Sequence, residues 1–166
     1  MTEELVLPNV YGIVSSTRDG VKAVLIQRRW KPVSDPLNSG RWELPGGKWR
    51  AWESAHECLR REVLEESGIE LTRIVEPESE SDLNDQSVIA LSGASVVQMV
   101  RGPYPSAILV LHADGEGSPL ARGDGSRDAQ WMAVEEVAQR MKHDSASFTP
   151  LTFAALASWL RETAAR

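Results

Sequence analysis

Two apolar stretches near the start of the chain have the pattern of paired β-strands. Residues 10–15 and 21–28 are rich in β-branched side chains, and residues 17–20 between them have the composition of a tight turn. These segments predict a β-hairpin. Residues 31–47 are rich in Pro, Gly, Ser and Asn and predict a long loop, interrupted by a short strand at residues 41–44.

The clearest local signal marks a helix over residues 54–67. Ser54 followed three residues later by Glu57 forms a capping box, which satisfies backbone N–H groups at a helix start. Gly68 follows the apolar-periodic run in the position where helices often end in the left-handed conformation. The segment therefore carries both a start and a stop signal.

The remainder of the chain alternates between strand and helix patterns. We expect strands at residues 69–75, 88–100, 107–112 and 129–132, and helices at residues 134–141 and 150–163. Thr149 and Pro150 have the chemistry of an N-cap and a first helical residue. A polar loop is expected at residues 76–87 and a sixteen-residue connection at residues 113–128. Strands interleaved with helices indicate an α/β (α+β) fold with a mixed β-sheet.

The length and the cysteine content favour a single domain without a disulfide framework. A chain of 166 residues fits one domain, which we place at residues 1–166. The single cysteine, Cys58, excludes an intrachain disulfide framework and a multi-cysteine zinc site. We expect no secretory leader, because residues 1–5 lack a basic and an apolar region, and the longest aliphatic run, residues 107–111, is far short of the roughly 20 residues that span a bilayer. We expect a cytoplasmic protein without a membrane partner, and a homodimer is left open.

The charge is negative overall but unevenly distributed. A net charge of −6 speaks against general binding to nucleic acid or to anionic membranes, which requires a basic surface. Residues 28–61 nevertheless hold eight Lys or Arg and only four Asp or Glu. A basic segment in an acidic chain suggests a small anionic ligand, although a solvated positive face is the alternative.

Three carboxylates lie on the apolar side of the predicted helix. At about 100° per residue, Glu62, Glu65 and Glu66 share an arc that overlaps the apolar positions of the same helix. Like charges at this spacing destabilise a helix by about 0.2–0.5 kcal/mol per pair, and partial burial adds to that cost. Arg61 is spaced to pair with Glu57 and Glu65, which leaves the other two unmatched. Clustered carboxylates without Cys or His suit Mg²⁺ or Mn²⁺, although a solvated acidic face is the alternative.

The loop ahead of the helix adds features of a phosphate site. Gly46 and Gly47 allow close backbone approach, and a carbonyl group there can complete a metal shell. Lys48 and Arg50 add positive charge beside the two glycines. Together with the carboxylates, these residues indicate a site for phosphate groups bridged by a metal ion.

The spacing of these residues resembles the complete box of the Nudix hydrolase family. Nine positions match: Gly47, Glu53, Arg61, Glu62, Val63, Glu65, Glu66, Gly68 and Ile69. The sharp resemblance covers residues 41–69. It implies a Nudix-like α/β/α sandwich that hydrolyses a nucleoside diphosphate linked to another moiety, with Mg²⁺, or Mn²⁺, as cofactor. A nucleotide-type small molecule is therefore the expected partner.

The resemblance also implies roles for individual residues. It assigns the metal to the carbonyl of Gly46 and the carboxylates of Glu62, Glu65 and Glu66. Arg61 would orient a glutamate, and Glu53 would support the site or act as a base. Glu65 on the helix and Asp124 in the late loop are further candidates for the proton-accepting carboxylate, although most loop aspartates are turn formers.

Substrate contacts are expected from the basic segment and its tryptophans. We expect Arg28, Arg41 and Lys48 to bind phosphate groups and Trp42 to stack on a base, with a place in the core as the alternative for Trp42. The chain departs from the family pattern at two positions. Trp52 stands where a glycine often precedes the first glutamate, and Cys58 stands where a small apolar residue is usual.

The family resemblance leaves the substrate open. The stretch from Trp42 to Lys48 resembles the branch that removes damaged, including oxidised, nucleoside triphosphates. A pyrophosphatase acting on ADP-sugars or dinucleotides and a catalytically silent nucleotide-sensing module are the alternatives. An enzyme like the isoprenoid-diphosphate isomerases would need a catalytic cysteine in the N-terminal half of the sheet, and the chain has only Cys58, inside the box helix.

Overall fold

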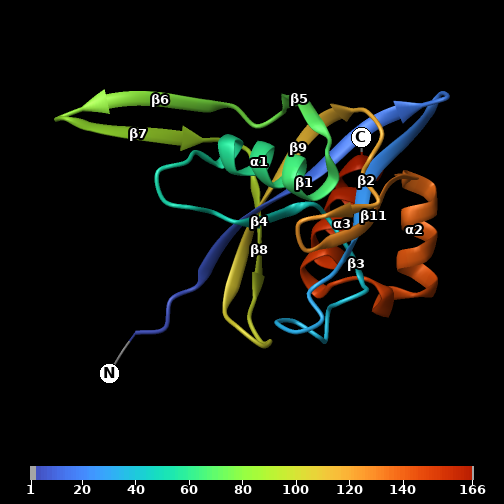
Figure 1. The fold of residues 1–166 in the computed structure, drawn as a ribbon. Helices are drawn as coiled ribbons and strands as arrows, with labels where there is room; N and C mark the ends of the chain where they lie inside the picture. Colours follow the sequence, from blue (N-terminus) through green and yellow to red (C-terminus); the bar gives the residue numbers. More distant parts are fainter. Residues whose placement is uncertain (1–2, 166) are drawn as a thin grey trace.

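A computed structural model describes residues 3–165. It shows a curled mixed β-sheet with helices on both faces (Figure 1). Helix α1 (Ala55–Ser67) packs on one face, while α2 (Val134–His143) and α3 (Pro150–Ala164) pack on the other. The expected α/β (α+β) sandwich with a mixed sheet is confirmed. Within the described residues, no helix combines the length and the apolar character needed to cross a membrane.

The main sheet is built around β1 and β9. Its central path runs β10-β11-β2-β1-β9-β5, with β3 added to β2, β4 to β1 and β8 to β9. The strands are β1 (Leu7–Arg18), β2 (Val21–Arg29), β3 (Trp42–Glu43), β4 (Gly46–Lys48), β5 (Glu70–Ile74), β8 (Ser95–Met99), β9 (Ser106–Glu116), β10 (Arg122–Gly123) and β11 (Ser126–Ala133). Only the β1–β9 pair among these is parallel, and the β1–β2 hairpin is as predicted.

Alternation along β1 divides the core into two layers. Val10 and Val14 pack with the apolar side of α1, whereas Tyr11 and Ile13 pack with α2 and α3. Successive side chains of a strand point to opposite faces, so one strand supplies both cores. The central strand is buried on both faces, which explains its nearly continuous apolar sequence.

The predicted signals at both ends of α1 are confirmed. The Ser54 hydroxyl accepts a hydrogen bond from the Glu57 backbone N–H, and the Glu57 carboxylate accepts one from the Ser54 N–H. Gly68 ends the helix at φ 71°, and its N–H donates to the Leu64 carbonyl. At the start of α3, Pro150 is in the first turn as expected, but the Thr149 side chain makes no capping hydrogen bond.

The middle of the chain differs from its prediction. Residues 76–87, expected as a polar loop, contain β6 (Glu78–Leu83), which pairs with β7 (Gln86–Leu91) in a separate hairpin that projects from the body (Figure 1). Asn84 and Asp85 form its turn with φ of 52° and 57°, the backbone of a tight hairpin turn. Both faces of the β6–β7 hairpin are exposed to solvent, so β6 lacks the apolar alternation of a half-buried strand.

Two further predictions about the connections were wrong. Residues 88–100 are not one strand, because the chain turns at residues 92–94 between β7 and β8. The sixteen-residue connection at 113–128 is shorter than expected, because β9 continues to Glu116, where it pairs with β5, and β11 begins at Ser126. A short strand at residues 46–48 was missed, since two glycines carry no strand signal.

Trp52 has an unusual backbone. Its φ is 67°, in the left-handed region that bulky residues rarely adopt, and its side chain is fully exposed. The left-handed conformation costs a residue with a Cβ about 1–2 kcal/mol. A glycine at this position would avoid this cost, because it has no Cβ.

Replacing Trp52 by glycine is therefore expected to relieve backbone strain. We expect Trp52→Gly to unfold with a free energy about 1 kcal/mol higher than Trp52→Ala, measured by urea denaturation. Trp52→Ala is the matched control, because it removes the same exposed ring but keeps the Cβ. Equal stability of the two variants would show that the backbone here is not strained.

Candidate active site

Arg61 lies at the centre of a cluster of carboxylates on α1 and the preceding loop. Its Nε and Nη2 donate to the two carboxylate oxygens of Glu53 at 3.0 and 2.8 Å. Its Nη1 donates to Glu62 and, at 3.3 Å, to Glu65. The predicted pairing with Glu65 is confirmed, but Glu57 is occupied by the helix cap and the pairing with Glu57 was wrong. One guanidinium thus contacts three carboxylates and neutralises only part of their charge.

Glu53 is held as an anion by these contacts. Its hydrogen bonds from Arg61 are the main cause that lowers its pKa to about 2, and the Arg50 backbone N–H donates to it at 2.8 Å. The Nη2 of Arg61 also donates to the Lys48 carbonyl at 3.2 Å. These bonds join the loop before α1 to the helix. A carboxylate with so low a pKa is a poor proton acceptor near neutral pH, so Glu53 is better suited to orient Arg61.

Glu66 occupies a different environment, buried beneath the cluster. Its side-chain Oε2 accepts from the Gly46 backbone N–H at 2.9 Å and from the Gln27 amide at 2.7 Å. Only 4% of Glu66 is exposed, and burial raises its pKa well above the ordinary value, with the nearby charge of Glu43 adding to the effect. The carboxylate therefore needs a positive charge to be stable as an anion at neutral pH.

Gly47 brings the backbone of β4 against the α1 carboxylates. A Cβ at Gly47 would lie 2.6 Å from the carboxylate of Glu62, closer than van der Waals contact allows. Strand β4 is held in place by antiparallel pairing with β1, with Gly47 opposite Val10. The glycine pair therefore lets a main chain with free polar groups approach the carboxylates.

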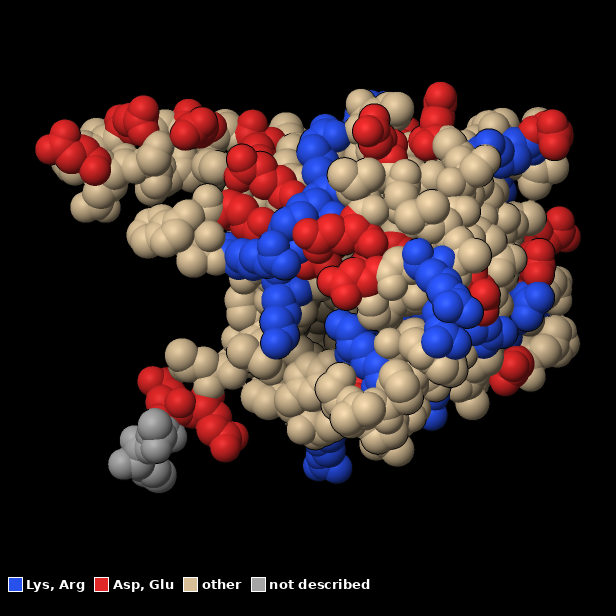
Figure 2. Space-filling model, in the orientation of Figure 1, with Lys and Arg blue, Asp and Glu red and all other residues tan. Residues whose placement is uncertain are grey.

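The predicted basic residues lie in different surroundings, and Arg28 contacts Trp42, which packs with α2 and α3 rather than with α1. Arg28 donates to the Gly40 carbonyl at 2.7 Å, and its guanidinium lies 3.9 Å from the centre of the Trp42 ring. Trp42 is 4% exposed and packs in the core, the alternative that the sequence left open. Lys48 is exposed and Arg41 is half-buried. Figure 2 shows acidic and basic side chains gathered over α1 and the preceding loop.

The segment that contains Asp124 lies against the end of α1. The Asp124 N–H donates to the Glu65 carbonyl at 3.1 Å, and the Ser126 hydroxyl donates to the Glu66 carbonyl at 2.7 Å. The Leu120 N–H donates to the Ser67 carbonyl at 2.8 Å. Asp124 itself is exposed. Asp124 comes 58 residues after Glu66 in the sequence. The fold nevertheless places its segment beside α1, the helix that bears the other candidate carboxylates.

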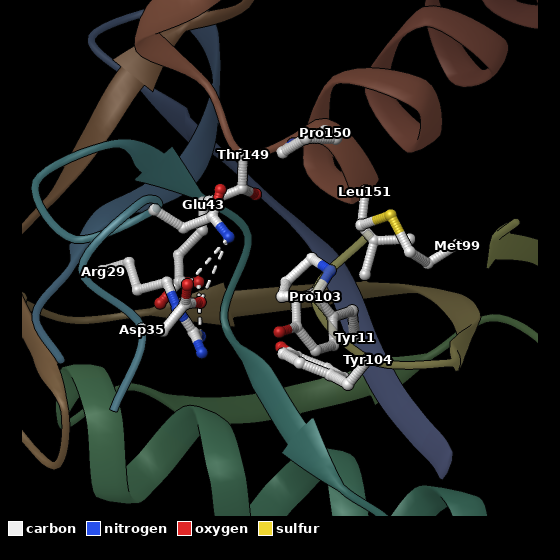
Figure 3. Close-up of a pocket in the computed structure, with 11 residues that line it drawn as sticks. Tyr11, Arg29, Asp35, Glu43, Met99, Pro103, Tyr104, Thr149, Pro150 and Leu151 are labelled. Carbon is white, nitrogen blue, oxygen red and sulfur yellow. Dashed lines mark hydrogen bonds and ion pairs between the residues drawn. The ribbon is translucent and has the colours of Figure 1, made fainter. Parts of the chain in front are cut away.

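A small pocket is lined by residues of β1, β2 and β3 and of the start of α3, as Figure 3 shows. On one side, Arg29 pairs with Asp35 at 2.7 Å and with Glu43 at 3.2 Å. On the other side, the rings of Tyr11 and Tyr104 lie together with apolar groups. The eleven residues that line it are Tyr11, Arg29, Asp35, Asn38, Glu43, Met99, Pro103, Tyr104, Thr149, Pro150 and Leu151. The cavity has a volume of about 20 Å³, which is room for about one water molecule and not for a nucleobase.

Comparison with known proteins identifies the family. A family model described as the NUDIX domain matches residues 7–152. The chain belongs to the Nudix family. The match extends far beyond the box, from the first residue of β1 into α3, so it includes both layers of the core.

Relatives of this Nudix protein include an annotated sequence from Mycobacterium tuberculosis. That protein, named "Putative 8-oxo-dGTP diphosphatase 2", is 37% identical over 114 residues, which cover 69% of this chain and 67% of the relative. Among solved structures, the Nudix domain of Shewanella oneidensis NrtR with ADP ribose aligns over 97% of this chain and 90% of that chain, with a TM-score of 0.67 and 18% identity. A MutT Nudix hydrolase from Burkholderia pseudomallei aligns over 90% and 96%, with a TM-score of 0.59 and 23% identity.

The donor atoms of this Nudix site suit a hard divalent cation. Glu62, Glu65 and Glu66 offer carboxylate oxygens, and Gly46 and Gly47 offer carbonyl oxygens of an approaching backbone. Within residues 3–165, no three acidic, His or Cys side chains converge closely enough to hold an ion as they stand. The guanidinium of Arg61 is the present counter-charge for Glu62 and Glu65. The composition of the site fits Mg²⁺ or Mn²⁺, because Arg61 contacts one oxygen of each of Glu62 and Glu65 and leaves the other oxygen of each carboxylate for an ion.

The close approach at Gly47 makes a substitution there informative. We expect Gly47→Ala to displace the Glu62 carboxylate and lower kcat/KM by about 10²-fold, the effect of misplacing a catalytic group by about 1 Å. Steady-state kinetics and circular dichroism measure activity and folding. Gly20→Ala is the control, because its Cβ in the β1–β2 turn would meet nothing within 4 Å. Unchanged kinetics in Gly47→Ala would contradict the account of Glu62.

Several residues near the site were missed by the sequence analysis. Arg29, Glu43, Tyr11 and Tyr104 line the pocket in Figure 3, and Gln27 holds Glu66. A buried Gln or Glu inside an apolar stretch is the signal that could have found Gln27 and Glu43, since buried polar groups need partners. The sequence around Tyr11 and Tyr104 does not indicate that they line one pocket, because only the fold brings the two residues together.

Glu43 predicts a pH dependence of stability. Burial raises its pKa from 4.5 to about 7, opposed by Arg29. The folded state therefore holds a proton that the unfolded state releases, and folding stability is lost as pH rises from about 4.5 through 7.

We expect the free energy of unfolding of Glu43→Gln, minus that of the wild type, to increase as pH rises from 5 to 8. The expected gain is about 1–3 kcal/mol, since one pKa unit is about 1.4 kcal/mol. Urea denaturation at both pH values measures it, with the exposed Glu135→Gln as control. A difference that does not change with pH would show that Glu43 titrates normally.

Proposed function

We propose that this Nudix hydrolase uses Mg²⁺, or Mn²⁺, to hydrolyse a pyrophosphate bond in a nucleoside diphosphate linked to another moiety. The observation that carries the proposal is the carboxylate cluster around Arg61, with Glu66 buried and bound to the Gly46 N–H. Its negative charge is not balanced by Arg61 alone, and oxygen donors of this kind suit a divalent cation.

Within this proposal, the ion is held by the Gly46 carbonyl and the carboxylates of Glu62, Glu65 and Glu66. When bound, a divalent ion neutralises phosphate oxygens and makes a coordinated water a stronger nucleophile. Arg61 holds Glu53, Glu62 and Glu65 in fixed positions. Lys48, next to Gly46 and Gly47, and Arg41 supply positive charge for the phosphate groups, whereas Arg28 contacts Trp42 and the Gly40 carbonyl.

The proton acceptor is proposed to be a carboxylate at the edge of the cluster. Asp124 is exposed beside the end of α1, where water and substrate can reach it. Glu65 is the second candidate, with its side chain 37% exposed. Glu53 is less suited, because Arg61 holds its pKa at about 2.

The substrates proposed are nucleoside triphosphates, including oxidised ones such as 8-oxo-dGTP. The name of the Mycobacterium tuberculosis relative supports this class. ADP-ribose and dinucleotides are the alternatives, and the Nudix domain crystallised with ADP ribose has the same fold.

Two finer proposals follow from the substrate class. The partner is a small nucleotide rather than a nucleic acid, in line with a net charge of −6. A cytoplasmic location is proposed because nucleoside triphosphates are made and used there. A homodimer remains a prediction that light scattering would test.

A panel of nucleotides tests the proposal. The protein is incubated with 8-oxo-dGTP, dGTP, CTP, ADP-ribose and a dinucleoside tetraphosphate, with Mg²⁺ or with EDTA, and products are separated by ion-exchange chromatography. We expect Mg²⁺-dependent release of a nucleoside monophosphate from at least one triphosphate. Binding of nucleotides by calorimetry without turnover of any of them would instead establish the nucleotide-sensing module.

A further inference from the structure

Gln27 is a buried amide in an otherwise apolar strand. It is fully buried on β2, two residues after Leu25, which packs against α1, so both side chains point to the α1 face. Burying an amide costs free energy unless its groups are hydrogen-bonded. Its presence at this position therefore requires a partner on that face.

The amide of Gln27 lies beside two buried carboxylates. Its Nε2 donates to Oε2 of Glu66 at 2.7 Å. On the neighbouring strand, Glu43 is paired with Gln27 in register, and hydrogen bonding from Gln27 is one cause that lowers the pKa of Glu43. A neutral donor between two carboxylates reduces their repulsion without adding charge.

The bonds to Glu66 distinguish its two oxygens. Both donors, the Gln27 amide and the Gly46 N–H, bind Oε2, at 2.7 and 2.9 Å. Among the residues that the structure describes, no hydrogen-bond donor is found for Oε1 of Glu66. Fixing one oxygen of a carboxylate leaves the other as the atom that can meet a cation.

The amide oxygen of Gln27 has no protein partner in the same part of the chain. Oε1 is buried, and no hydrogen bond reaches it from any residue between 3 and 165. A buried acceptor without a partner costs about 1–3 kcal/mol, so such groups in native proteins point to a ligand or an ordered water. Mg²⁺ characteristically keeps several water ligands, whose O–H groups are donors.

We infer that Gln27 is a positioning residue of the metal site. Its amide nitrogen holds Oε2 of Glu66, so that Oε1 faces the ion, and its amide oxygen accepts a hydrogen bond from a water of the ion's hydration shell. The inference rests on the proposed metal-dependent hydrolysis, which it deepens. Gln27 itself touches neither the ion nor the substrate.

Manganese binding tests this inference directly. Free Mn²⁺ is titrated by electron paramagnetic resonance with the wild-type chain and with Gln27→Met, which has similar length but no hydrogen bonds. We expect the dissociation constant for Mn²⁺ to rise about 10–100-fold, the usual effect of losing a partner of a metal ligand. The Mg²⁺ concentration that gives half the maximal rate should rise by a similar factor, with a smaller change in kcat at saturating Mg²⁺.

Thermal unfolding separates positioning from a structural role. Without metal, we expect the Tm of Gln27→Met to stay within about 4 °C of the wild type, because methionine removes an unpartnered buried oxygen as well as a hydrogen bond. A lower Tm with an unchanged affinity for Mn²⁺ would show that Gln27 only supports the fold and would overturn the inference. Gln98→Met, an exposed position on β8, is the control and should change neither quantity.

The outcomes distinguish this inference from the proposed function. If the wild type binds Mn²⁺ and Gln27→Met binds it equally well, only the role of Gln27 is wrong. If the wild type binds no Mn²⁺, the proposed function fails and the role of Gln27 with it. If Gln27→Met does not fold, Gln27→Asn replaces it. The shorter amide keeps the polarity but withdraws the donor from Glu66, and the same weakening of Mn²⁺ binding is expected.

Discussion

Replacing Glu66 by glutamine is expected to lower kcat by about 10³-fold while the protein stays folded. Glutamine has the same shape and can still accept from the Gly46 N–H, but it carries no charge for a cation. Stabilisation of the transition state by a metal is worth several kcal/mol, and each 1.4 kcal/mol is tenfold in rate. Steady-state kinetics on the best substrate of the nucleotide panel measure the loss.

The thermal stability of Glu66→Gln should not fall with its activity. Burial raises the pKa of Glu66, which means that the anion destabilises the folded state at neutral pH without a bound ion. Glu66→Gln should therefore unfold at a Tm equal to or above that of the wild type at pH 8. Glu70→Gln, an exposed carboxylate just beyond α1, is the control for charge. Full turnover in Glu66→Gln would remove Glu66 from the metal site.

Replacing Arg61 by alanine is expected to lower kcat/KM by about 10²-fold. Arg61 binds Glu53, Glu62 and Glu65, so its loss leaves two of the proposed metal ligands free to move. Misplacing catalytic groups by about 1 Å costs rates of this order. The pKa of Glu53 should rise from about 2 towards its ordinary value, because the hydrogen bonds from Arg61 are the main cause of the shift.

Two other variants separate geometry from charge at this position. Arg61→Lys keeps the positive charge but cannot bind three carboxylates with one planar group, and we expect it to recover little activity. Arg60→Ala removes the neighbouring arginine, which is exposed and donates to the Leu71 carbonyl, and it should keep nearly full activity. If Arg61→Lys were as active as the wild type, Arg61 would act only through its charge.

The sequence predicted α1 accurately because its signals are local. The capping box and Gly68 lie within the helix ends that they define, and both are present in the structure. The unusual placement of Glu62 and Glu66 on the apolar side was also visible from helical periodicity alone. Helical spacing also predicted that Arg61 pairs with Glu57, and this prediction was wrong. The Glu57 carboxylate instead accepts a hydrogen bond from the Ser54 N–H in the helix cap.

The sequence could not predict contacts that depend on the path of the chain. Gln27 and Glu66 are 39 residues apart, and Tyr11 and Tyr104 meet across the β1–β9 part of the sheet. The β6–β7 hairpin was missed for another reason. Residues 88–91 of β7 fall in the predicted strand, but both faces of β6 are exposed, so β6 has none of the apolar alternation from which strands are predicted.

Crystals grown with Mn²⁺ and a non-hydrolysable nucleoside triphosphate test the central claim most directly, through the anomalous signal of the metal. The account predicts an ion within about 2.5 Å of carboxylate oxygens of Glu62, Glu65 and Glu66, including Oε1 of Glu66, with the triphosphate bound to the same ion. An ion bound elsewhere, or a nucleotide bound with Arg61 still holding Glu62 and Glu65 and no metal between them, would contradict it.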